Sequence, residues 1–96
     1  MNTLHKIRKC KKKICELAER YGMEHLRVFG SVARNEDIPG SDVDFLVRIR
    51  DGADLLDLIA FSQDLEELLQ QKTDVVTEDE LSPHFKNLIF REAIVI

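Results

Sequence analysis

The stretch DVDFLVRI, residues 42–49, constrains the fold of this chain more than any other stretch. Its second half is apolar at consecutive positions rather than at alternate ones, which is typical of a strand covered on both faces. Pro39-Gly40 predicts a turn before it, and Asp51-Gly52 predicts a break after it. We therefore expect this strand to lie in the middle of a sheet.

Three further patterns precede or follow this strand. Residues 3–21 carry apolar side chains at helical spacing with lysines between them, which predicts one amphipathic helix that stops at Gly22. HLRVFG (25–30) and KTDVVT (72–77) predict two more strands. The chain thus alternates between helices and strands, as expected for an α/β or α+β protein.

The second half of the chain predicts two helices. Asp54 caps a helix that begins at Leu55, and Ser82-Pro83 begins the last helix. The terminal IVI is either a short strand or a contact surface. The apolar helix positions that we expect to be buried are Leu4, Ile7, Cys10, Ile14, Leu17, Ala18 and Tyr21, then Leu55, Leu58, Ile59, Leu65, Leu68 and Leu69, and finally Phe85, Leu88, Ile89 and Ala93.

Length and composition favour one small globular domain over residues 1–96. The chain has 96 residues, of which 44% are hydrophobic and 33% charged, and both fractions are ordinary for a globular protein. No run approaches the roughly 18 apolar residues that a membrane span requires, and no apolar segment of a signal peptide follows the basic N-terminus. We expect a cytoplasmic protein without a membrane partner.

Charge is distributed unevenly along the chain. Residues 1–48 carry ten Lys/Arg and seven Asp/Glu, whereas residues 49–96 carry four and eleven, within a net charge of -4. The basic excess is concentrated in KIRKCKKK (6–13), which is typical either of a solvated helix face, of a nucleic-acid contact or of a surface that docks a protein. Because the chain is acidic and lacks an aromatic stacking platform, direct RNA or DNA binding is not expected.

Two aspartates, Asp42 and Asp44, open the central strand with one residue between them. Residues i and i+2 of a strand point to the same face, so these carboxylates stand about 7 Å apart at their bases and can converge at their tips. Oxygen ligands without a neighbouring cysteine or histidine suit Mg²⁺ or Mn²⁺ better than zinc. The pair predicts a cation site, although an acidic pair can also be only a solvated strand end.

A glycine and a serine, Gly30 and Ser31, join the preceding strand to a short predicted helix, SVAR. Free backbone N–H groups at such a turn can bind an anion, and glycine permits a close approach of a phosphate. Arg34 lies three residues beyond Ser31 and could make a forked contact with a triphosphate. A plain strand–helix turn and an ordinary surface arginine are the alternatives.

A third carboxylate, Asp74, lies within the strand predicted over 72–77. If this strand pairs with the strand over 42–49, Asp74 meets Asp42 and Asp44. Three carboxylates could then hold two metal ions about 3.5–4 Å apart, an arrangement that serves phosphoryl transfer. Taken alone, Asp74 could equally be an acid at the edge of a strand.

The spacing of these residues resembles a known family. Gly30-Ser31, ten further residues and then Asp42-x-Asp44 form the signature of the DNA polymerase beta-like nucleotidyltransferase superfamily. The strings GSVARNEDIPGSDVDFLV and LEELLQQKTDVVTEDELSPHFKNLIFREAIVI are similar to its minimal nucleotidyltransferase (MNT) branch, over roughly residues 25–96. Members often carry a glycine where Asn35 stands. Because asparagine tolerates a left-handed backbone, we expect the turn to survive.

The resemblance implies a fold and a set of site residues. The fold is a small α/β (α+β) nucleotidyltransferase fold, a palm-like mixed sheet with flanking helices. Gly30 and Ser31 would grip the nucleoside triphosphate, Asp42 and Asp44 would bind metal, and Asp74 would be the third catalytic carboxylate and metal ligand. The implied cofactors are two Mg²⁺ ions, or Mn²⁺ in their place, and ATP is the implied substrate.

The resemblance also implies a function. MNT proteins are often antitoxins paired with HEPN-domain ribonuclease toxins, and the MNT partner can transfer AMP from ATP to a toxin tyrosine. We therefore interpret the chain as a Mg²⁺-dependent protein adenylyltransferase that neutralises a cognate HEPN toxin and forms a hetero-oligomer with it.

Two other interpretations remain. The chain could be a non-catalytic antitoxin that masks its toxin through the basic helix edge, Phe90 and the apolar tail. A small-molecule nucleotidyltransferase of the antibiotic-modifying kind would need an added acceptor domain, for which these residues leave no room.

Overall fold

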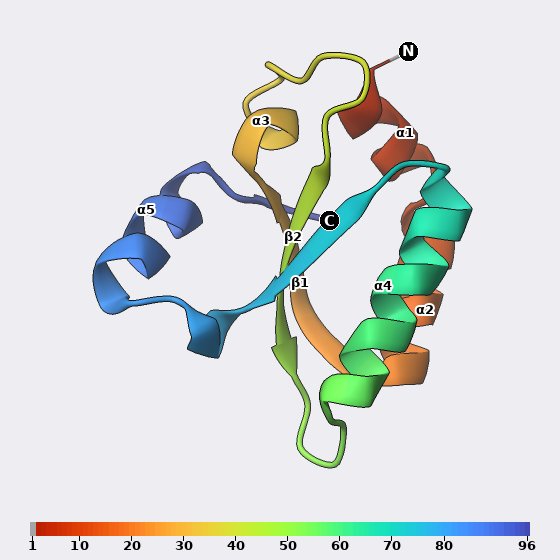
Figure 1. Ribbon diagram of the computed structural model, residues 1–96, viewed down its shortest axis with the longest axis vertical. Coiled ribbons are helices and arrows are strands. Elements are labelled where there is room, and N and C mark those ends of the chain that lie inside the picture. Colours follow the sequence, from red (N-terminus) through yellow and green to blue (C-terminus); the bar gives the residue numbers. More distant parts are fainter. Residues whose placement is uncertain (1) are drawn as a thin grey trace.

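The structure, a computed structural model, describes residues 2–96 and is built around a four-stranded mixed sheet (Figure 1). The strands are β1 Met23–Phe29, β2 Val43–Ile49, β3 Thr73–Thr77 and β4 Ile94–Val95. Their order is β3-β2-β1-β4, with β1 antiparallel to both of its neighbours and β2 parallel to β3. The strand predicted over 42–49 is therefore central, and the predicted fold class is confirmed.

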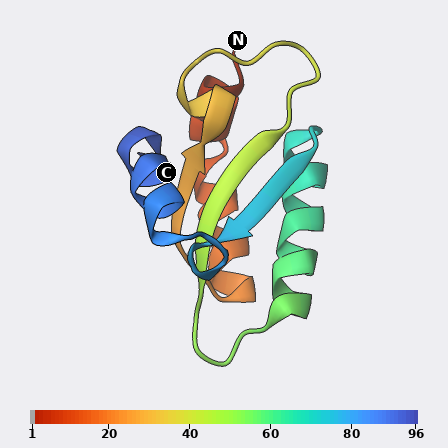
Figure 2. The same ribbon diagram turned by 60° about the vertical axis from the view of Figure 1, so that its left-hand side comes forward.

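Helices flank this sheet on both sides. The helical segments of the described residues are α1 Thr3–Lys9, α2 Lys11–Tyr21, α3 Gly30–Ala33, α4 Leu55–Leu69, the 3-10 turn η1 Glu78–Glu80 and α5 Pro83–Glu92. In Figure 2, α4 and the N-terminal helices lie on one side of the sheet and α5 lies on the other. None of the helices within residues 2–96 combines the length and the apolar character that a bilayer crossing requires.

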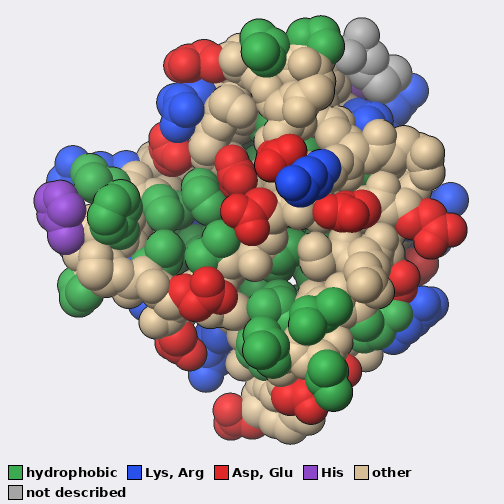
Figure 3. Space-filling model, in the orientation of Figure 1, with side chains coloured by type: hydrophobic (Ala, Val, Ile, Leu, Met, Phe, Trp, Pro, Cys, Tyr) green, Lys and Arg blue, Asp and Glu red, His purple; other side chains and the backbone are tan. Residues whose placement is uncertain are grey.

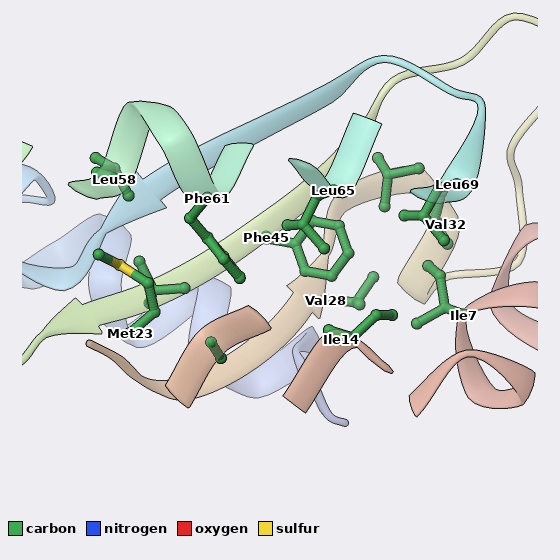
Figure 4. Packing of buried hydrophobic residues seen from close by; sticks show 13 residues of the cluster. Ile7, Ile14, Met23, Val28, Val32, Phe45, Leu58, Phe61, Leu65 and Leu69 are labelled. Atoms are coloured by element: carbon green, nitrogen blue, oxygen red, sulfur yellow. The ribbon is translucent and has the colours of Figure 1, made fainter. Parts of the chain in front are cut away.

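The main core lies between the sheet and the helices α1, α2 and α4 (Figure 4). Phe45 from the central strand and Phe61 from α4 are its largest fully buried side chains. Val28 from β1 and Ile14 from α2 are also completely inaccessible to solvent. A fully buried side chain of this size stabilises the fold by about 1.5–3 kcal/mol, so most of the apolar stabilisation comes from this side of the sheet.

The N-terminal region is two helices, so the prediction of one helix over 3–21 is wrong. The chain turns at Cys10, whose backbone angles are φ -92° and ψ 7° and whose N–H donates to the carbonyls of both Lys6 and Ile7 at 3.1 Å. No glycine or proline marks this break. Tertiary contacts override the local pattern, because α1 also bonds to the loop after α3, with Thr3 Oγ1 donating to Asp37 at 2.7 Å.

Two of the predicted core positions of α4 are exposed. Leu55 and Ile59 are 63% and 48% accessible to solvent. The buried residues of the helix, Leu58, Phe61, Leu65 and Leu69, are spaced by three or four and form one stripe. Ile59 lies one residue away from this stripe, and Leu55 lies in the first turn of the helix, before the stripe begins. The prediction that these two side chains are buried is therefore wrong.

Two of the predicted core positions of α5 are also exposed. Phe85 and Leu88 are 60% and 46% accessible, while Ile89 and Ala93 are half-buried. The helix instead faces the sheet with Phe90, whose ring lies 4.6 Å from the guanidinium carbon of Arg27. The amphipathic pattern indicated a helix correctly, but it did not indicate which side of that helix would face the sheet.

Candidate active site

The strand register brings two of the three predicted acids directly together. Asp44 of β2 lies opposite Asp74 of the parallel strand β3, and on its other side it pairs with Phe29 of β1. Asp42 precedes Asp44 by two residues, immediately before β2 begins. Alternation along a strand therefore places all three carboxylates on one face at the start of β2 and β3.

The burial pattern identifies that face. Val43, Phe45 and Val47 are fully buried and belong to the cluster that packs against the helices. Asp42 and Asp44 alternate with them and so project from the opposite face of the sheet. Figure 3 shows acidic side chains gathered on this face over the start of β2 and β3.

The environment of Asp44 penalises its negative charge. Partial burial raises the pKa of this carboxyl above its ordinary value, and the neighbouring carboxylates of Asp74 and Asp42 raise it further. The guanidinium of Arg34 acts in the opposite direction, and Glu92 adds to the increase. A cation stabilises a carboxylate that lies among other carboxylates. This group of acids therefore favours the binding of a cation.

The donor set at this face fits Mg²⁺. It consists of carboxylate oxygens at two paired positions and one adjacent position, and hard oxygen donors are those that Mg²⁺ prefers. Among residues 2–96, no three acidic, histidine or cysteine side chains converge closely enough to form a ready-made metal site. Because like charges repel, a converged arrangement of these carboxylates needs a cation to stabilise it.

Gly30 approaches Asp44 too closely for any side chain to fit between them. Its φ is +74°, and a Cβ built on it would collide with Asp44 Oδ2 and lie 3.3 Å from Asp44 Cγ. An L-residue would be strained at this φ even without the collision. A side chain at position 30 would therefore need both a strained backbone and a displaced Asp44 carboxylate.

The turn after Gly30 has the shape that the sequence predicted. The short helix α3 ends at Ala33 with Arg34 as its C-cap, and Asn35 adopts a φ of +59°, which confirms that asparagine tolerates a left-handed conformation there. The backbone N–H of Glu36 donates to the carbonyl of Ser31 at 2.8 Å and closes the turn. Ser31 is half-buried at the start of α3.

Gly40 and Ser41 form a second Gly-Ser pair, which lies in a turn that leads into β2. Gly40 has a φ of +91°, and Ser41 Oγ accepts a hydrogen bond of 3.0 Å from the Ile38 N–H. Gln71 Nε2 donates to the carbonyl of Ser41 at 2.9 Å, which ties this loop to the residues before β3. An open hollow of about 670 Å³, lined in part by Ser41 and Lys72, borders the residues that precede Asp42 and Asp74.

Glu92, at the end of α5, is the site residue that sequence reasoning missed. Its Oε1 accepts from the Gly30 N–H at 2.9 Å, and its Oε2 accepts from Arg34 Nη1 at 2.9 Å. Arg34 is also near Glu36, at 3.6 Å. The available signal was a single acid before the apolar tail AIVI. The N–H of Gly30 and the guanidinium of Arg34, both predicted to bind phosphate, thus bind the carboxylate of Glu92.

Three carboxylates lie on one face of a small mixed sheet, beside a glycine turn. Comparison with known families identifies the class of protein that carries this site. The nucleotidyltransferase domain family matches residues 7–96, and the chain belongs to this family. It is, more narrowly, an MNT-domain protein, in agreement with the resemblance found in the sequence.

Relatives and solved structures support this assignment. A Methanocaldococcus jannaschii protein provisionally named a protein adenylyltransferase is 39% identical over 88 residues, which cover 92% of this chain and 95% of the relative. Protein adenylyltransferase MntA of Thermococcus cleftensis is 36% identical over 84% of this chain and 82% of its own length.

Two solved structures share the fold. A structure provisionally described as a minimal nucleotidyltransferase superposes with a TM-score of 0.90 at 38% identity, covering 100% of this chain and 97% of that one. A crystal structure described as a toxin-antitoxin with AMP-PNP gives a TM-score of 0.73 at 21% identity, covering 88% of this chain and 69% of that one. The second likeness is one of fold alone.

Proposed function

We propose that the chain transfers AMP from ATP-Mg²⁺ to a hydroxyl group, that of a tyrosine, on a cognate HEPN ribonuclease toxin and thereby neutralises it. The observation that carries this proposal is the pairing of Asp44 with Asp74, with Asp42 on the same face and Gly30 in contact with Asp44. The whole reaction would be carried by one domain, residues 1–96, acting in the cytoplasm.

In this proposal, Asp42, Asp44 and Asp74 would hold two Mg²⁺ ions, for which Mn²⁺ could substitute. When bound, the ions supply neutralisation of the phosphate charge and polarisation of the α-phosphate. Without them the three carboxylates would repel a triphosphate, so the acids select the Mg²⁺ complex of the nucleotide. ATP alone should therefore bind weakly.

The triphosphate would lie at the turn between β1 and α3. Ser31 would bind phosphate oxygens through its hydroxyl and its N–H group, and the unoccupied N–H donors of Arg34 would add a charge-assisted contact. The missing side chain of Gly30 keeps this turn against Asp44, which places the phosphates beside the carboxylates. The β- and γ-phosphates are thereby oriented as a leaving group.

The acceptor would approach Asp74, whose side chain is exposed on the edge strand β3. The hydroxyl oxygen forms a bond to the α-phosphorus while the bond from that phosphorus to the bridging oxygen of pyrophosphate breaks. The hydroxyl proton passes to a carboxylate oxygen of Asp74, which acts as general base. AMP is then linked to the acceptor, and pyrophosphate leaves.

The names of the relatives support an acceptor that is a protein, because two of them are named protein adenylyltransferases. The structure described as a toxin-antitoxin with AMP-PNP supports a toxin partner and an adenine nucleotide. These names and this description belong to the other proteins. We extend the activity to this chain because it shares their fold.

The test is a transfer assay with the protein encoded by the adjacent gene. Both proteins are incubated with Mg²⁺ and ATP labelled at the α-phosphate, and label should become covalently attached to the partner. The variants Asp42→Asn and Asp44→Asn should not transfer label. No transfer by the wild type, or equal transfer by these variants, would contradict the proposal.

A second candidate function is inhibition by masking alone. The observation that favours it is the exposure of Phe85, Leu88 and Val95 on α5 and β4, a set of apolar side chains that a partner could cover. The double variant Asp42→Asn/Asp44→Asn separates the two functions. Neutralisation that survives in this variant, at normal complex formation, would favour masking over transfer.

A further inference from the structure

We propose that Glu92 is a positioning residue, which holds the triphosphate-binding turn in its working geometry through one carboxylate shared between Gly30 and Arg34. This inference rests on the proposed function, because it concerns the same nucleotide site. It assigns a purpose to the C-terminal segment, α5 and β4, which contributes no side chain to the carboxylate triad.

The strand β4 delivers Glu92 to this position. It pairs with β1 in an antiparallel register that sets Val95 opposite Arg27 and Ile94 opposite Val28. Glu92 is the last residue of α5, two residues before this strand, and it lies near Gly30, where β1 ends and α3 begins. A strand of two residues contributes little stability by itself, but its pairing with β1 holds the end of α5, which carries Glu92, close to the end of β1.

The two oxygens of Glu92 bind the two ends of the same short turn, the backbone of Gly30 at the start of α3 and the side chain of its C-cap, Arg34. Oε1 bonds to the backbone of Gly30 and Oε2 to the side chain of Arg34, each at 2.9 Å. Both bonds are charge-assisted, which makes them shorter and stronger than neutral ones. One carboxylate thus fixes the beginning of α3 and the guanidinium beyond its end.

The same contacts connect Glu92 to Asp44. Gly30, which Glu92 holds through its N–H, is in direct contact with the Asp44 carboxylate. A small displacement of Gly30 would therefore change the distance between the phosphate-binding turn and the acids. Because catalytic groups must be held in place to be effective, this link gives Glu92 an influence on nucleotide binding without contact with the nucleotide.

Glu92 does not block the site in this arrangement. A guanidinium has five N–H donors, and the bond to Glu92 engages only Nη1 of Arg34. The remaining donors of Arg34 and the N–H and hydroxyl of Ser31 are the groups left to bind phosphate. The single N–H of Gly30 is committed to Glu92, so its part is structural support of the turn.

The experiment compares Glu92→Ala and Glu92→Gln with a matched control, Glu36→Gln. Glu36 also lies near Arg34, at 3.6 Å, but its side chain is exposed and the bond to the Gly30 N–H belongs to Glu92. Two quantities are measured: the affinity for ATP-Mg²⁺ by titration calorimetry, and kcat and KM for transfer of AMP to the partner. The amide resonance of Gly30 reports the hydrogen bond independently of activity.

Glu92→Ala should weaken ATP-Mg²⁺ binding and raise KM by about tenfold, with a smaller fall in kcat, because it removes two charge-assisted hydrogen bonds. Glu92→Gln keeps one acceptor oxygen and should restore roughly half of this loss on a logarithmic scale. Glu36→Gln should change affinity by less than about twofold. The Gly30 amide signal should shift strongly only in Glu92→Ala.

Two results would overturn the inference. Unchanged affinity in Glu92→Ala, with the wild-type fold by circular dichroism, would mean that the contact has no role at the site. Tighter binding in both variants would mean that Glu92 competes with phosphate for Gly30 and Arg34. If the wild type itself neither binds ATP-Mg²⁺ nor transfers AMP, the proposed function fails instead, and the Gly30 resonance still shows whether Glu92 positions the turn.

Discussion

The two faces of the sheet are built in different ways. The face toward α1, α2 and α4 is apolar and contains the fully buried aromatic residues Phe45 and Phe61. The face toward α5 carries the carboxylates, and none of the residues of α5 itself is buried. On that side the fully buried Leu46 lies beside polar contacts, such as those of Glu92 with Gly30 and Arg34. Stability and chemistry are thus separated by the sheet.

The largest expected effect is on the free energy of unfolding, and it compares two phenylalanines, one on each side of the sheet. Phe61→Ala should lower the free energy of unfolding by about 3–5 kcal/mol, because it removes a fully buried ring and leaves a cavity. Phe85→Ala on α5 should cost less than about 1 kcal/mol, because that ring is mostly exposed. Urea denaturation measures both. Equal losses would mean that α5 is packed as firmly as the main core.

The next effect concerns activity on the carboxylate face. Asp44→Asn should reduce AMP transfer by at least about a hundredfold, since even supporting groups around a metal contribute 10–100-fold. Asp51→Asn, at an exposed acid after the same strand, is the matched control and should keep full activity. The free energy of unfolding of Asp44→Asn should not fall. A variant that loses activity by unfolding would contradict the separation of the faces.

A smaller effect distinguishes two glycines that share a positive φ. Gly30→Ala should lower the free energy of unfolding by about 2–3 kcal/mol, because backbone strain adds to the collision with Asp44. Gly40→Ala should cost about 1 kcal/mol from strain alone, since nothing lies within 4 Å of an added Cβ. Thermal denaturation and ATP-Mg²⁺ titration test the pair. Equal effects would show that the contact with Asp44 is unimportant.

The smallest effect is a pH dependence. Because burial and the neighbouring acids raise the pKa of Asp44 in the folded state, the folded protein binds this proton more tightly than the unfolded chain does. The resulting contribution to stability is therefore lost as pH rises from the unfolded pKa of Asp44 through its folded pKa. Above that range Asp44 is ionised in both the folded and the unfolded state, and it lowers the free energy of unfolding by a constant amount.

Melting temperatures of the wild type and Asp44→Asn, compared from about pH 3 to pH 7 without Mg²⁺, test this dependence. The melting temperature of the variant should rise relative to that of the wild type as pH rises through the acidic range, and the difference between the two should then become constant. Added Mg²⁺ should reduce the difference, since a bound cation stabilises the wild-type carboxylates. A difference that is independent of pH would contradict the account of Asp44.

Sequence predicted the parts of the molecule that local rules determine. Gly22 ends α2 in a left-handed conformation, and Asp54 caps the start of α4 as expected. The central position of β2 followed from its consecutive apolar residues. These features depend on nearby residues alone, which is why a single sequence was enough to predict them.

The remaining features depend on contacts between distant residues. The break at Cys10 has no local marker, and the exposure of Phe85 depends on which side of α5 faces the sheet. Glu92 contacts Gly30, 62 residues away along the chain, where the end of α5 meets the end of β1. The position of Asp74 beside Asp44 could be predicted because it required only one assumption, the pairing of two strands.

The measurement that tests the central claim most directly is a comparison of two ATP labels. The chain, its partner and Mg²⁺ are incubated with ATP labelled at either the α- or the γ-phosphate. We predict that only the α-label becomes covalently attached to the partner, that pyrophosphate appears in equal amount, and that Asp44→Asn abolishes both. Attachment of the γ-label, or attachment of neither label by a wild-type protein that still neutralises its partner, would contradict the assignment of this site to AMP transfer.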